Sequence, residues 1–465
     1  MSFVSLSFII LFAVVFVLYH FLRQVRSQNL LLLAASCIFY AWWDWRFLSL
    51  MLGLSLVSYL AALSIEAATS SSRRNAVLAL CVAAQLACLA YFKYVNFFGN
   101  SLAIVLGAIG LQARWTYLDI VLPLAISFHT FQLIAYVVDV WRREYQAERQ
   151  IVTFFAFSFF FPQLIAGPIE RAEHLLSQFK RPRSVDARAV RDAIGLVVLG
   201  YAVKIVIADT AGPIVDSLFV PAQPYAWSVV LGTVLFGVQI YADFLGYSLI
   251  AKGCAGLLGF KLIWNFRFPY RAVSPSDFWR RWHISLSRWL RDYVYIPLGG
   301  NRYGASRTVT ALMLTMILGG LWHGAAWNFV LWGLFLGVAL ATWRLLGIPN
   351  QPQTRIGRFA GWLGTMSIVF IGWFLFRATG PGLMEALITA LRNWEWAPLH
   401  LSLLTATLML MFALALFEYV QINLVERTTM SARSSWTRVA SLGSLITLTL
   451  VFLERHRPTF IYFQF

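Results

Sequence analysis

Two histidines are the side chains best suited to chemistry in this sequence, and the first is His323. It lies in the stretch LGGLWHGAAWN (318–328) and is the only ionisable residue between Val309 and Trp343. An imidazole inside a bilayer is costly unless it faces a cavity or finds hydrogen-bond partners, so its presence there points to function. A neutral imidazole can remove a proton from a hydroxyl group that attacks a carbonyl carbon. His323 is therefore a candidate general base.

The residues around His323 are either small or able to donate hydrogen bonds. The small ones, which leave room for another helix or a thin ligand, are Gly319, Gly320, Gly324, Ala325 and Ala326. The donors are Trp322, Trp327 and Asn328. The same pattern is also typical of a close-packed helix interface that contains a hydrogen-bonded histidine. His129 is a competing candidate, although Thr130 and Gln132 offer it nearby partners.

The second histidine, His283, lies in a segment where the apolar runs stop (266–307). Ser274, Pro275 and Asp277 form a good helix start, so we expect a helix of about five turns that ends before Pro297. At about 100° per residue, one face of this helix carries arginines and the opposite face is apolar. The arginines are Arg280, Arg281, Arg288 and Arg291. His283 falls between the two faces.

Such a helix has two interpretations. It can lie in the headgroup layer, with its arginines on lipid phosphates and its tryptophans at the boundary. Alternatively, the arginines and the loop 299–302 hold the phosphates of an anionic donor at a cytoplasmic mouth. His283 taken alone is more often a hydrogen-bonded structural residue than a catalyst.

The elements that carry these residues must lie in lipid. Of the 465 residues, 60% are apolar and only 12% are charged. A soluble domain carries about twice that share of charge, roughly a quarter of its residues, so soluble, disordered, collagen-like and disulfide-rich classes are excluded. We predict an all-α, multi-pass membrane protein with about a dozen membrane helices and one domain over residues 1–465.

Several apolar windows are too short to cross a bilayer alone. Residues 102–111, 151–165 and 310–321 are expected to be tilted, broken or re-entrant, which is tolerated only where protein or a water-filled cavity surrounds them. The formal charge of +17 fits basic cytoplasmic loops and an anionic ligand better than nucleic acid. The sequence contains no metal-site or soluble-enzyme motif with the flanking pattern that such a motif requires.

Longer motifs resemble the membrane-bound O-acyltransferase family, within it the bacterial polysaccharide branch typified by alginate O-acetyltransferase membrane proteins. The similarity covers nearly the whole chain. The matching stretches include LPLAISFHTFQLIAYVVDVWR from Leu122, PQLIAGPIERAEHLLSQF from Pro162, KIVIAD from Lys204, QIYADFLGYSLIA from Gln239, NFRFPYRAVSPSDFWRRWHISLSRWLRDYVYIPLGGNR from Asn265, GGLWHGAAWNFVLWG from Gly319, WFLFRA from Trp373 and the terminal FIYFQF.

The resemblance implies a ring of helices around a funnel or tunnel, with His323 of the WHG motif as the catalytic residue at its narrow part. It also implies that His283 of the RRWHIS motif assists donor placement or catalysis. No cofactor is expected to be bound. Acetyl-CoA is the implied donor, and the protein is expected to pass its acetyl group across a bacterial inner membrane to an exopolysaccharide such as alginate, directly or through a periplasmic acetyltransferase partner.

The residues expected to bind the donor or support the site are Arg280, Arg281, Trp282, Arg288, Asp292, Arg302, Trp322 and Asn328. The sequence departs from the family pattern at three positions. Leu245 and Leu249 replace polar residues, and Leu336 stands where many members carry a third histidine. Because of these departures, the resemblance does not identify the molecule that accepts the acetyl group.

Alternatives of other classes remain. Acylation of a cell-wall polymer, a lipid or a protein would use the same chemistry. A scaffold of a polysaccharide export complex would tolerate the loss of both histidines. A transporter would show repeated halves around a midplane site, and the sequence has no such repeat.

Overall fold

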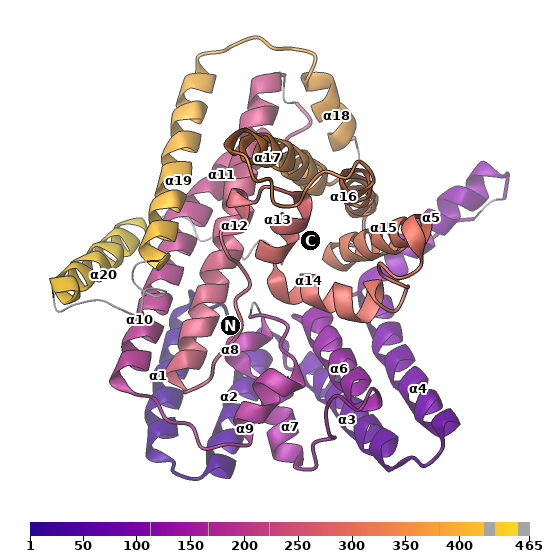
Figure 1. The fold of residues 1–465 in the computed structure, drawn as a ribbon, viewed down its shortest axis with the longest axis vertical. Helices are drawn as coiled ribbons and strands as arrows, with labels where there is room; N and C mark the ends of the chain where they lie inside the picture. Colours follow the sequence, from indigo (N-terminus) through magenta and orange to yellow (C-terminus); the bar gives the residue numbers. More distant parts are fainter. Residues whose placement is uncertain (112, 166, 223, 381, 423–432, 454–465) are drawn as a thin grey trace. The chain divides into compact units, whose positions relative to one another are not determined.

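The computed structural model describes residues 1–111, 113–165, 167–222, 224–380, 382–422 and 433–453. Every regular element in these ranges is a helix (Figure 1). The all-α, multi-pass prediction is therefore confirmed for the described part of the chain. The described residues divide into two compact units, and α12 carries the chain from the second unit into a short segment of the first.

The first unit comprises Met1–Asp186 and Ala255–Ile263. Its helices are α1 (Leu6–Phe21), α2 (Val25–Asp44), α3 (Arg46–Ala67), α4 (Ser71–Leu89), η1 (Ala90–Tyr94), α5 (Val95–Ala108), α6 (Ile126–Trp141), α7 (Ile151–Ser158), α8 (Phe161–Leu164), η2 (Ala172–Leu176) and α9 (Ser177–Phe179). One core cluster of this unit joins side chains that are far apart in the sequence, among them Tyr40, Met51 and Phe159.

The second unit comprises Ala187–Cys254 and Trp264–Phe465. Its helices are α10 (Ala187–Ala202), η3 (Val203–Ala208), α11 (Asp209–Leu218), α12 (Ala226–Leu257), η4 (Pro269–Arg271), α13 (Pro275–Arg281), α14 (Ile284–Leu290), η5 (Arg291–Tyr295), α15 (Gly304–His323), α16 (Trp327–Leu345), α17 (Arg355–Arg377), α18 (Leu383–Ala390), α19 (Leu399–Gln421) and α20 (Arg433–Phe452). Both candidate histidines belong to this unit. The prediction of a single domain stays a prediction.

Eight helices of the described residues are long and apolar enough to cross a membrane, and three shorter apolar helices accompany them. The eight cover Arg46–Ala67, Ser71–Ala108, Ala187–Leu218, Ala226–Leu257, Gly304–His323, Trp327–Leu345, Arg355–Arg377 and Leu399–Gln421. The predicted ring around a funnel stays a prediction.

The three short windows have different outcomes. Residues 151–165 do form a broken element, because α7 ends before Phe159 and α8 begins just ahead of Pro162. Residues 102–111 contain the end of a continuous helical stretch, Ser71–Ala108. Residues 310–321 are not broken, since α15 is continuous over 20 residues, and the alternatives of a tilted or re-entrant element stay predictions. The small and polar first residues of α15, which precede the apolar window, extend the helix to a length that can span.

The expected five-turn helix around His283 is wrong, although its start is correct. Ser274 Oγ accepts a hydrogen bond from the Asp277 N–H at 3.1 Å, as the capping pattern predicts. The helix then breaks after Arg281, and α14 begins at Ile284 (Figure 1). His283 itself has left-handed backbone angles, with φ of 39°.

The helix can break here because a separate backbone segment forms hydrogen bonds with the N–H and carbonyl groups that the break leaves without helical partners. The Arg267 N–H donates to the Arg281 carbonyl oxygen at 3.0 Å, and the Ile284 N–H donates to the Asn265 carbonyl oxygen at 2.9 Å. Orphaned helix-end groups would otherwise be costly in a buried place. Residues 265–267 therefore fix where α13 ends and α14 begins.

Candidate functional site

His323 is the last residue of α15, at the tip of a helical hairpin with α16. Glycines bring the two helices together, as the sequence predicts. A Cβ atom on Gly320 would overlap the carbonyl oxygen of Phe329, and one on Gly333 would overlap the carbonyl oxygen of Met316. Gly324, directly after His323, faces the Phe329 ring so closely that a side chain there would collide with it. The hairpin is thus packed backbone to backbone next to the imidazole.

Aromatic rings surround the His323 imidazole. Its ring centroid lies 5.0 Å from Trp322, 5.2 Å from Trp332 and 5.3 Å from Phe376, all with edge-to-face angles. The side chain is only 6% exposed. This box restricts the orientation of the imidazole and removes competing water, which strengthens electrostatic interactions within the site.

Asn328 supports one wall of that box. Its Nδ2 donates to the Phe376 carbonyl oxygen at 3.1 Å, in the last turn of α17. The amide therefore holds α16 against the helix that carries Phe376. Trp327, which the sequence suggested as a donor beside His323, is instead 60% exposed. Trp322 is buried in the box.

His283 packs against the same aromatic group, through contacts with Trp322 and Phe244. Its ring lies 5.8 Å from Trp322 and 4.7 Å from Phe244 of α12. Its Nδ1 lies 3.5 Å from Ser285 Oγ, and that hydroxyl donates to Asn265 Oδ1 at 2.7 Å. The structure thus brings both predicted histidines into contact with one tryptophan.

Burial also sets the protonation state of His283, which lies outside the eight helices long enough to span a membrane. Burial disfavours the charged imidazolium and lowers the pKa of His283 from 6.5 to about 3. His283 therefore stays neutral from mildly acidic to alkaline pH. A group with so low a pKa is a weak proton acceptor near neutral pH.

Trp282 has a structural position next to His283. It is 1% exposed, and its ring centroid lies 4.8 Å from that of Trp373 on α17 and 5.6 Å from that of Phe278 on α13. Tyr241 of α12 also contacts it. Trp282 therefore joins three helices around the two histidines.

The predicted arginine stripe is divided by the helix break. Arg280 and Arg281 lie on α13, whereas Arg288 lies on α14, so their relative angles do not follow one helical period. Arg281 forms an ion pair with Asp277 at 3.0 Å. Asp292 pairs with Arg291 at 2.6 Å. Arg302 is exposed and lies in the loop that follows η5.

A buried charge cluster in the second unit was missed by the sequence reasoning. The Lys204 ammonium lies 2.5 Å from a carboxylate oxygen of Asp209 and 2.5 Å from one of Asp243. Lys204 lies inside a candidate span, so the rule that singled out His323 also applied to it. The cluster joins η3 to α12 next to Phe244, where a Cβ atom on Gly246 would collide with Lys204.

Two further histidines in apolar helices, His129 and His400, have polar partners. His129 Nε2 lies 3.0 Å from Ser55 Oγ, so this competitor of His323 has a structural contact. His400 Nε2 lies 3.1 Å from Ser228 Oγ, and its Nδ1 accepts from the Ala397 N–H. The three family departures, Leu245, Leu249 and Leu336, are all buried apolar side chains.

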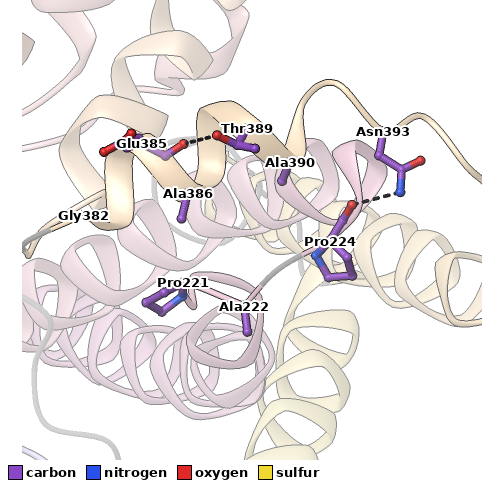
Figure 2. A pocket seen from close by; sticks show the side chains of 9 residues that line it. All are labelled: Pro221, Ala222, Pro224, Gly382, Glu385, Ala386, Thr389, Ala390 and Asn393. Carbon is purple, nitrogen blue, oxygen red and sulfur yellow. Dashed lines mark hydrogen bonds between the residues drawn. The ribbon is translucent and has the colours of Figure 1, made fainter.

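A pocket of about 560 Å³ lies elsewhere in the second unit. Figure 2 shows its lining, with Pro221, Ala222 and Pro224 facing α18 and Asn393. Among the described residues that line it, Glu385 is the only ionisable one, and none of them is a predicted site residue.

Comparison with known proteins agrees with the motif analysis. The sequence model of the membrane-bound O-acyltransferase family matches residues 142–347, which include both histidines. The protein named "Probable alginate O-acetylase AlgI" of Pseudomonas putida is 38% identical over the full length of both chains. The protein of that name in Pseudomonas aeruginosa is 42% identical, over 81% of this chain and 72% of its own.

A relative with another acceptor in its name also matches. The peptidoglycan O-acetyltransferase of Helicobacter pylori is 34% identical, over 80% of this chain and 76% of its own.

Proposed function

Because the chain belongs to the membrane-bound O-acyltransferase family and is an O-acyltransferase, we propose that it transfers acetyl groups from cytoplasmic acetyl-CoA for the O-acetylation of an exopolysaccharide such as alginate. The transfer crosses a bacterial inner membrane and ends on the polymer directly or through a periplasmic acetyltransferase partner. The observation that carries the proposal is the buried His323 imidazole, in a chain whose whole length aligns with an alginate O-acetylase.

In the proposed reaction, His323 acts as the general base. It removes the proton from the acceptor hydroxyl while the hydroxyl oxygen bonds to the thioester carbonyl carbon. The carbon–sulfur bond then breaks, and the proton passes from the imidazolium to the leaving thiolate. The products are an acetyl ester and CoA with a free thiol. General acid–base catalysis of this kind contributes about 10²- to 10⁴-fold, and placement in a dry site supplies more.

We assign His283 a positioning role. Its low pKa makes it a poor base at neutral pH, whereas its contacts with Phe244 and Trp322 fix one side of the aromatic group around His323. Asn328 of α16, Trp322 of α15 and Trp282, the residue that follows α13, support that group.

Purified protein in nanodiscs, supplied with acetyl-labelled acetyl-CoA, tests the donor. The proposal expects slow release or transfer of label that depends on His323. The acceptor is tested in a strain that lacks the gene, by measuring the acetyl esters of each cell polymer. Loss of esters from the exopolysaccharide alone is the expected result, and unchanged esters on it would contradict the proposal.

A cell-wall acceptor is the second candidate, because a peptidoglycan O-acetyltransferase aligns over 80% of this chain. The same strain separates the two. Loss of acetyl esters from purified peptidoglycan, with the exopolysaccharide unchanged, would favour the cell-wall acceptor. Full restoration of either ester by a His323→Ala protein would instead favour a scaffold.

A further inference from the structure

We propose that Arg302, Arg307 and Arg344 form a phosphate-binding site that holds the donor, at the loop between η5 and α15. This inference rests on the proposed function, because it concerns the donor of the same reaction. It places the phosphate groups at this loop, which contains Arg302, one of the residues that the sequence predicts to bind the donor.

The loop is held in one conformation by its own hydrogen bonds. The Gly300 N–H donates to the Tyr295 carbonyl oxygen at 2.9 Å, and the Arg302 N–H donates to the Gly299 carbonyl oxygen at 3.1 Å. Thr308 Oγ1 donates to the Gly300 carbonyl oxygen at 3.0 Å. Gly299 and Gly300 have positive φ angles, 113° and 55°, which glycine adopts most readily. A fixed loop loses little conformational entropy when it binds a ligand.

Three arginines from different elements meet at this loop. Arg344, near the end of α16, donates through Nη1 to Asn301 Oδ1 at 2.8 Å, and Tyr295 Oη donates to the same oxygen at 2.6 Å. The Arg307 guanidinium lies 4.7 Å from the Tyr303 ring centroid. Its Nε would lie 3.5 Å from a Cβ atom on Gly299. Arg302 is part of the loop itself.

The local charge is not balanced by acids. In the part of the chain that the structure describes, no carboxylate forms an ion pair with Arg302, Arg307 or Arg344, whereas Arg281 and Arg291 each have one. All three side chains are exposed. A guanidinium offers five N–H donors in a planar fork that matches phosphate, and the hydrogen bond of Arg344 to Asn301 uses one of them.

The position of the loop restricts the kind of phosphate compound. The loop lies directly before the first residue of α15, and His323 is the last residue of that helix. At 1.5 Å per residue, a helix of this length separates the two by about 28 Å. A donor that binds at the loop must therefore carry its acyl group on a long flexible arm. The pantetheine thioester of acetyl-CoA has this form, whereas a small acyl phosphate does not.

The test compares Arg302→Gln, Arg307→Gln and Arg344→Gln proteins with an Arg355→Gln control in nanodiscs of phosphatidylcholine. Arg355 is an exposed arginine at the start of α17, separated from Arg344 by a short connection. Each loop variant is expected to raise the KM for acetyl-CoA about tenfold with little change in kcat, since each loses a charge-assisted contact to the donor. Arg344→Lys should recover only part of the loss, because lysine lacks the fork.

Lipid headgroups are the other source of phosphate at such a loop. If the loop bound them in place of the donor, KM would rise only in nanodiscs that contain phosphatidylglycerol, or not at all. Either result overturns the inference, and so does a KM increase of equal size in Arg355→Gln.

Calorimetry with inorganic pyrophosphate tests the site without turnover. The wild-type protein is expected to bind it, and the Arg302/Arg307/Arg344 triple glutamine variant is expected to lose that binding. Equal binding by both proteins contradicts the site. A wild-type protein that binds pyrophosphate and transfers no acetyl group from acetyl-CoA contradicts the proposed donor and leaves the anion site standing.

Discussion

His323 and His283 contact the same tryptophan but depend on different parts of the chain. The surroundings of His323 come largely from one hairpin, α15 and α16, whose glycines and whose Trp322 and Trp332 lie within a dozen residues of it. His283 stands at a break that only the segment 265–267 makes possible. The first arrangement is local in sequence, and the second depends on hydrogen bonds between separate segments.

This difference separates the proposed roles. A rigid, dry box around His323 suits proton transfer, because the ring is held in one orientation. The break at His283 suits positioning, because it joins α12, α13 and α14 around Trp322. Changes at the hairpin should therefore affect the chemical step, and changes at the break should affect how well the site is assembled.

The largest expected effect comes from the imidazole of the hairpin. His323→Ala should lower acetyl transfer by a factor of about 10² or more while the protein stays folded, because the general base is lost. Transfer of labelled acetyl groups by purified protein measures this. His20→Ala, which removes an exposed histidine of α1, is the matched control and should keep wild-type activity. A well-folded His323→Ala protein with full activity would refute the role.

A smaller effect is expected from the packing of the hairpin. Gly320→Ala places a methyl group against the Phe329 carbonyl oxygen, so the two helices must separate next to His323. The cost should be about 1–3 kcal/mol, the usual range for overpacking, with acetyl transfer lowered several-fold. Thermal unfolding in detergent measures the stability.

Gly53→Ala is the control for that change. No atom lies within 4 Å of a Cβ built on Gly53, so an alanine fits there without strain and favours the helix. Equal stability of the Gly320→Ala and wild-type proteins would show that the hairpin tolerates a wider separation than the structure indicates.

The sequence predicts the hairpin better than the break, for a physical reason. The small residues around His323 and the cap at Ser274 are local patterns that the structure contains, and eight of the about a dozen predicted membrane helices are long and apolar enough to span in the described residues. The break at His283 depends on backbone groups of Asn265 and Arg267, which no period or cap of the helix itself encodes. A helical period projected across the break therefore gave a continuous arginine stripe that does not exist.

The aromatic side chains that α17 contributes to the site could not be predicted from local sequence patterns either. Phe376 and Trp373 come from α17, some 50 residues beyond His323, and only the folded chain brings them to the histidines. Lys204 differs, because an ammonium in an apolar helix is a local signal. Its two carboxylate partners, however, come from α11 and α12.

His283→Asn should lower transfer only about twofold, which is the smallest of the three effects, because His283 positions the site and does not take the proton. Asparagine keeps a polar side chain but loses the ring contacts with Phe244 and Trp322.

The same variant should change how stability depends on pH. Since burial lowers the pKa of His283 to about 3, the folded protein resists protonation there, while an unfolded histidine titrates near 6.5. The folded state thus loses stability as pH falls from about 6.5 toward 3, and His283→Asn should weaken that loss.

The pH dependence of acetyl transfer by the His283→Asn protein, measured beside the wild type, tests the division of roles most directly. Because His283 is neutral throughout the range from pH 5 to pH 8, any fall in rate on the acid side must come from another group, which we propose is His323. The variant should show the wild-type midpoint with a lower plateau. An acid limb that disappears or shifts when His283 is replaced would show that His283 is the titrating base.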